Sequence, residues 1–187
     1  RRRECEMTDL QIATLHERVI ERITAEFTTV TLVTGENDAA DEQELPLPAI
    51  VVAITDVEGR PDADSDGTGR LPVQVYFAAT IVLSDRGQGV ALDLRDSSMA
   101  LASLVYGNRW GLGGHVGPAR FLQAGPDEFS PRIAGRRAWR VEWVQPAWIG
   151  RTAWPVLPGP VPQPLASWAP DIGTDHENEY RSLPDIG

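Results

Sequence analysis

The chain has 187 residues, 42% of them hydrophobic, and its formal net charge is −10. A chain of this length and composition usually buries one substantial core, which excludes disorder throughout. No apolar run reaches the roughly 18 residues that a membrane span needs, and no secretory signal is visible, so we expect no membrane partner. The single cysteine, Cys5, excludes an internal disulfide and fits a reducing compartment.

The charge is distributed unevenly along the chain. Residues 35–67 carry ten acidic side chains against Arg60 alone, whereas residues 86–151 carry nine arginines against five acids. Such polarity favours contact with a complementary surface, which could belong to another copy of the chain. Two solvated acidic loops that only keep the protein soluble are the equally open alternative.

The first predicted element is an amphipathic helix. Thr8 and Gln11 have the spacing of a capping box, which predicts the start of the helix. Apolar side chains then recur every three or four residues for about twenty residues, so this helix should cover one face of a sheet. Residues 28–34 are rich in β-branched side chains and predict a strand, and an acidic loop follows it.

The next segments predict the centre of the sheet. Residues 47–55 form an apolar strand, and residues 56–70 are a long hairpin loop rich in glycine and aspartate. Every odd position from 73 to 83 is apolar, so residues 71–84 predict one long strand with a buried face.

The second half adds another helix and two strands. Residues 90–105 place apolar side chains on one helical face, and Gly107 is well placed to end that helix. A glycine-rich link then leads to strands predicted at 118–124 and 138–145. We therefore predict an α+β domain over residues 8–145, with a mostly antiparallel sheet flanked by two helices.

From Pro146 onward the chain is rich in proline and tryptophan. Proline at this density should not continue a sheet, because each residue lacks a ladder donor, and it favours extended chain. Residues 146–187 are therefore predicted to be a long Pro/Trp-rich C-terminal arm. Because a solvated arm has little use for large aromatics, we expect Trp148 and Trp154 to be anchors on this domain or on a neighbour.

The acidic hairpin loop resembles the start of a calcium loop. Asp62, Asp64, Asp66 and the following glycine match the first half of the pattern, but Val73 occupies the position of the bidentate glutamate. The interpretation is an acidic loop without a bound metal.

No other pattern points to catalysis or to a cofactor. The cysteine and the three histidines, among them His16 and His115, have no metal-ligand spacing, and no nucleophile motif is present. We expect no metal, no cofactor and no enzymatic activity, with a small metal-dependent enzyme as a less favoured alternative.

A basic cluster lies around the last predicted strand. Its arginines include Arg136, Arg137 and Arg140, and in a chain of net charge −10 a dedicated nucleic-acid site is disfavoured. We expect these three arginines, together with the two arm tryptophans, to meet a neighbouring subunit or another partner.

The order of these elements resembles the tail terminator proteins of long-tailed bacteriophages, most closely the Mu-like prophage group. The resemblance is carried by the pattern of residues 47–55, 73–83, 91–105 and 138–145 and not by a signature motif. It implies an α+β subunit that forms a homohexameric ring on the head-proximal end of the tail tube. Such a ring stops tube polymerisation and joins the tail to a neck or head completion protein.

The resemblance also implies a channel through which DNA only passes, in a virion protein of the tail–neck junction that assembles in the host cytoplasm. Acidic loops facing that channel would repel DNA phosphates and let the genome slide. The candidates for the lumen are Asp62, Asp64 and Asp66 in one loop and Glu42 and Glu44 in the other. Another neck component, such as a head completion protein, is the nearest alternative, and a binding module for a host partner is a third.

Overall fold

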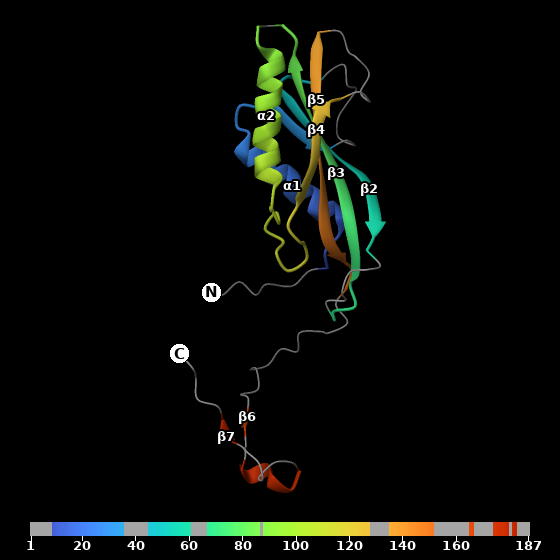
Figure 1. The fold of residues 1–187 in the computed structure, drawn as a ribbon, viewed down its shortest axis with the longest axis vertical. Coiled ribbons are helices and arrows are strands. Elements are labelled where there is room, and N and C mark those ends of the chain that lie inside the picture. Colours follow the sequence, from blue (N-terminus) through green and yellow to red (C-terminus); the bar gives the residue numbers. More distant parts are fainter. Residues whose placement is uncertain are drawn as a thin grey trace. The chain divides into compact units, whose positions relative to one another are not determined.

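The computed structural model describes residues 9–35, 45–60, 67–86, 88–127, 135–151, 165–166, 174–179 and 181–182. The chain divides into two compact units between Ala153 and Trp154. The larger unit carries both long helices (Figure 1).

The larger unit is an α+β domain. In chain order its elements are α1 (Ile12–Glu26), β1 (Leu32–Gly35), β2 (Ala49–Gly59), β3 (Leu71–Ser84), α2 (Val90–Val105), β4 (Arg120–Pro126) and β5 (Arg136–Ile149). The five strands form one sheet in the order β1-β2-β3-β5-β4. Only β1 and β2 pair in parallel, so the predicted mostly antiparallel sheet with two helices is confirmed.

Strand β3 organises this sheet, as its alternation predicts. It pairs along its whole length with β5, from Leu71 opposite Ile149 to Ser84 opposite Arg136. The odd-numbered side chains from Val73 to Ile81 are buried, whereas the even-numbered ones are mostly half-buried. The period of two therefore separates a core face from a wetter face.

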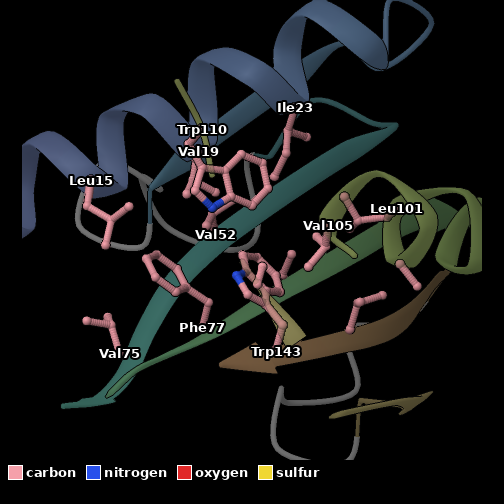
Figure 2. Close-up of a cluster of buried hydrophobic side chains, with 14 of the residues drawn as sticks. Leu15, Val19, Ile23, Val52, Val75, Phe77, Leu101, Val105, Trp110 and Trp143 are labelled. Atoms are coloured by element: carbon pink, nitrogen blue, oxygen red, sulfur yellow. The ribbon is translucent and has the colours of Figure 1, made fainter. Parts of the chain in front are cut away.

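Both helices pack against the core face. Helix α1 buries Leu15, Val19 and Ile23, and α2 buries Leu101 and Val105, all in one apolar cluster with the sheet (Figure 2). At its centre the indole of Trp143 stacks on the ring of Phe77, with centroids 5.2 Å apart and planes 2° from parallel. Within the described residues of the larger unit no helix covers the opposite side of the sheet, which we call the helix-free face.

The start of α1 differs from the prediction. The helix begins at Ile12 with Gln11 as its N-cap, and no side chain caps it, so the predicted start at a capping box is wrong. Thr8 lies outside the described residues. The preceding segment is extended instead, because Leu10 bridges to Gly150 and the carboxylate of Asp9 accepts from Arg151 Nε over 3.0 Å.

Two strand boundaries near the start of the sheet also differ. Strand β1 begins at Leu32, because Thr28 and Thr29 form a turn after α1. Strand β2 continues to Gly59, four residues beyond the predicted end, after a register shift between Ile54 and Asp56. The long β3 supplies backbone partners for these extra residues, which the local composition assigns to a loop.

Strand β5 continues through Ile149, so the predicted end of the sheet at Gln145 is wrong. The carbonyl oxygen of Pro146 accepts from Gly117 N over 2.8 Å, and Trp148 N donates to His115 O over 2.9 Å. The backbone of Pro146 therefore faces the 115–117 segment, and no hydrogen bond to β3 requires its missing N–H. The stretch predicted as the start of the arm is part of the sheet.

The smaller unit contains short elements in its described residues. These are β6 (Leu165–Ala166), the 3₁₀ helix η2 (Thr174–Glu179) and β7 (Arg181–Ser182). Strands β6 and β7 pair antiparallel, with Leu165 opposite Ser182 and Ala166 opposite Arg181. The remainder of the predicted arm lies outside the described residues.

Candidate assembly interface

The three arginines predicted for an interface do not share one surface. By the alternation of β5, Arg136 and Arg140 belong to the helix-free face, whereas Arg137 belongs to the helix side, opposite Leu83. Arg136 Nη2 donates to Leu45 O over 3.3 Å, and Arg140 Nε donates to Glu142 Oε1 over 2.6 Å. Arg137 is exposed and has no ion pair with a described residue, which makes it the arginine best placed for an outside partner.

Trp148, predicted as an anchor in the arm, belongs to the sheet. It lies opposite Pro72 in β3, and the guanidinium of Arg60 lies 6.0 Å from its ring centroid, within cation–π range. Its indole Nε1 is buried and has no hydrogen-bond partner among the described residues. The tryptophan therefore packs at the end of the helix-free face.

The other predicted site residues lie outside the described residues, and their roles stay predictions. They are the second anchor and the acidic loop residues: Trp154, Asp62, Asp64, Asp66, Glu42 and Glu44.

The helix-free face carries polar side chains that pair within the chain. The hydroxyl of Tyr76 donates to Glu58 over 2.8 Å, and this hydrogen bond raises the pKa of Tyr76. Arg120 Nη2 donates to the side-chain oxygen of Gln74 over 3.2 Å. At β5, Glu142 accepts from Gln123 and Arg140, each over 2.6 Å. These internal pairs are typical of a hydrated surface.

Two unpaired stretches along the margins of the sheet carry opposite charges. Strand β1 pairs with β2 only as far as Val52, so among the described strands nothing borders residues 53–59, which we call the β2 edge. The β2 edge carries Asp56 and Glu58. The outer margin of β4, which we call the β4 edge, carries Arg120.

Both edges also expose large apolar side chains. On the β2 edge Val57 is 40% exposed, and on the β4 edge Phe121 is 36% and Leu122 is 49% exposed. The sequence prediction placed Asp56–Val57–Glu58 in a loop and so missed the β2 edge. The polar–apolar–polar alternation of Asp56, Val57 and Glu58 was the available signal.

Helix α2 has a second apolar stripe on its solvent side. Leu92, Met99 and Tyr106 recur at seven-residue spacing and are exposed by 59%, 49% and 76%. A spacing of seven returns close to the same side of a helix, so the three side chains form one line. The prediction used only the buried stripe and did not identify this one.

The glycine-rich link, residues 111–117, is tied to the sheet through Arg70, the residue before β3. Arg70 Nη1 donates to Gly114 O over 3.1 Å and to His115 Nδ1 over 2.7 Å, so the acceptor Nδ1 carries no proton. Burial, and then the charge of Arg70, lower the pKa of His115. Both effects favour the neutral form of the imidazole.

The described part of the chain contains neither a cluster of metal ligands nor a helix able to span a membrane. There, no three side chains of the His, Cys, Asp and Glu types gather where they could hold a metal ion. No helix of that part combines the length and the apolar character needed to cross a bilayer. A scan against protein-family models found no match, and neither did a search of curated proteins.

Proposed function

We propose that this chain is a structural phage protein, a tail terminator that forms a homohexameric ring at the head-proximal end of the tail tube. The ring ends tube polymerisation and joins the tail to a neck or head completion protein in the virion. The order of helices and strands supports this proposal, because it is the order on which the resemblance to that family depends.

The observation that carries the proposal is the one-sided packing of the sheet between two unlike edges. Both helices lie on one face, and the polar side chains of the other face pair within the chain. At the two edges, as on the outer side of the short β1, backbone groups lack neighbouring strands among the described residues. A contact between two unlike patches closes into a ring when its rotation permits, whereas a symmetric contact stops at a dimer.

The charge of the chain supports a channel that does not bind DNA. Residues 35–67 have a strong excess of acidic side chains, and phosphate-binding surfaces are basic. In the proposed ring the two acidic segments face the lumen, so the genome passes through without forming a complex with the protein.

The solution mass tests this function, measured by light scattering at several concentrations, with and without purified tail tube protein. A hexamer, or a monomer that forms six-fold rings on tube ends in electron micrographs, supports the terminator. A chain that ignores tube protein and binds a neck protein instead is a head completion component. Failure to form rings and to bind either partner overturns a neck or tail role.

A further inference from the structure

The β2 edge and the β4 edge each present backbone groups without a strand partner among the described residues, although Val57 N on the β2 edge donates to Asp56 Oδ1 over 2.7 Å. An unpaired sheet margin is a template for another strand, and proteins usually protect it with charges and bulges. Both edges carry these devices, since register shifts lie between Ile54 and Asp56 and between Phe121 and Gln123. A partner strand with charges complementary to those of the edge would still be able to pair, whereas other strands would be kept away. In Figure 1 the C-terminal part of β2, which ends in the arrowhead, lies at the outer margin of the sheet.

The strand directions allow the sheet to continue from one copy into the next. Strands β2, β3, β5 and β4 are neighbours in that order, and each pairs antiparallel with the next. Strands β2 and β4 therefore run in opposite directions within one copy. When a second copy is placed beside the first in the same orientation, its β2 lies antiparallel to β4 of the first.

The side chains match on both faces in that arrangement. Asp56 and Glu58 lie opposite Tyr76 and Gln74 and so belong to the helix-free face, as does Arg120. On the helix side, the exposed Val57 of one copy would meet the exposed Phe121 of the next. Opposite charges and apolar pairs across neighbouring strands stabilise a sheet.

The symmetric alternatives are chemically worse. Pairing two β2 edges would gather four carboxylates from Asp56 and Glu58 of both copies, whereas pairing two β4 edges would form no ion pair, because Arg120 is the one charged residue of β4. Like charges on opposed strands are destabilising. The edge chemistry therefore favours head-to-tail association over a two-fold dimer.

We propose that the β4 edge of one copy pairs with the β2 edge of the next, so that the sheets of neighbouring copies become continuous around the assembly. This inference deepens the proposed ring function and rests on it. It assigns the subunit interface to residues 53–59 and 120–126, with Glu58 and Arg120 as its principal charges.

Chemical cross-linking tests the pairing in the full chain. With Cys5→Ser as background, the variants Val57→Cys, Phe121→Cys and both together are treated with a short bismaleimide. We expect a ladder of covalent oligomers from the double variant, dimers from a mixture of the two single variants, and no dimer from either single variant alone. Circular dichroism checks that each variant is folded.

A charge exchange gives an independent readout. Glu58→Arg and Arg120→Glu should each weaken self-association by about tenfold, since each brings like charges together, and the two combined should restore it. Glu17→Arg changes the charge equally at an exposed position of α1 and should have no effect.

The outcomes separate this inference from the proposed function. Rings without cross-links, or rings indifferent to the charge exchange, would overturn the edge pairing and leave the terminator proposal standing. Dimers from a single cysteine variant would show symmetric pairing and overturn it as well. A wild-type chain that never associates, alone or with tube protein, would overturn both.

Discussion

The imidazole of His16 donates its Nε2–H to the carbonyl oxygen of Val52 over 2.9 Å. Val52 is also the last residue of β2 that pairs with β1, where it lies opposite Gly35. The imidazole packs so close to Gly35 that a Cβ there would lie 2.7 Å from His16 Cε1. The helical histidine therefore joins α1 to β2 at the place where β1 ends.

Gly35→Ala should destabilise the domain by about 1–3 kcal/mol, because the added methyl group displaces the imidazole and breaks its bond to Val52. Chemical unfolding measures this loss as a lower midpoint with an unchanged slope. Gly59→Ala is the matched control, since Gly59 also ends a strand and a Cβ there meets nothing within 4 Å.

A double-mutant cycle identifies the cause of that loss. With His16→Ala as background, the alanine at position 35 has room, so most of the Gly35→Ala penalty should disappear. A penalty of the same size with and without the imidazole would mean that the backbone, and not His16, opposes the alanine.

Gln145→Leu should cost about 2–4 kcal/mol, since it leaves more than one buried polar group unpaired. The side chain of Gln145 is fully buried, and its Oε1 accepts from the indole Nε1 of Trp110 over 2.6 Å. Its amide nitrogen donates to Gly117 O. Urea unfolding measures the cost, and Gln74→Leu on the hydrated helix-free face should lose under about 1 kcal/mol. Equal losses for the two variants would contradict the importance of the buried network.

The stability of the wild-type domain should fall at mildly acid pH because of His115. Burial and Arg70 lower its pKa in the folded state below the ordinary 6.5. As the pH falls through 6.5, the unfolded chain binds the proton first, so this contribution to stability is lost as the pH falls toward the folded-state pKa. Above that range the imidazole is neutral in both states and the contribution is constant.

Thermal unfolding between about pH 5 and pH 8 compares the wild type with His115→Gln. The glutamine oxygen preserves an acceptor for Arg70 but does not titrate. The melting temperature of the wild type should therefore fall more steeply on acidification than that of the variant. Parallel curves would show that His115 does not contribute to the pH dependence.

The elements with a strong local period were predicted with their observed ends. Strand β3 at 71–84 and helix α2 at 90–105 both have uninterrupted patterns of buried side chains. In both, the local pattern and the tertiary contacts favour the same secondary structure. Two of the errors fall where residues distant in the sequence determine the structure. Residues 56–59 are strand because β3 lies beside them, and Pro146 remains in β5 because its backbone faces Gly117.

The candidate interface was less predictable than the fold. The sequence gathers Arg136, Arg137 and Arg140 into one cluster, although alternation along a strand already separates 137 from the other two. The β2 and β4 edges depend on which strands lie at the margins of the sheet. That order follows from non-local pairing, which the pattern of a single strand does not contain.

Removing residues 154–187 should leave the larger unit folded, with a melting temperature within about 4 °C of the full chain, equivalent to under about 1 kcal/mol. The described residues of its apolar cluster lie between Leu10 and Ile149, and the chain divides after Ala153. Truncation after Gln145, at the boundary that the sequence predicts, should be far more damaging. It removes the buried Ala147 and the strand pairs between Pro72 and Trp148 and between Leu71 and Ile149.

Thermal unfolding and light scattering on both truncated chains decide where the domain ends and what the remaining segment does. If the chain ending at Ala153 keeps both its melting temperature and its self-association, residues 154–187 are not needed for assembly. If it folds but no longer associates, that segment carries a contact between copies in addition to the strand edges. Equal losses of stability in the two truncations would mean that the segment after Ala153 is part of the folded core, contrary to the division of the chain.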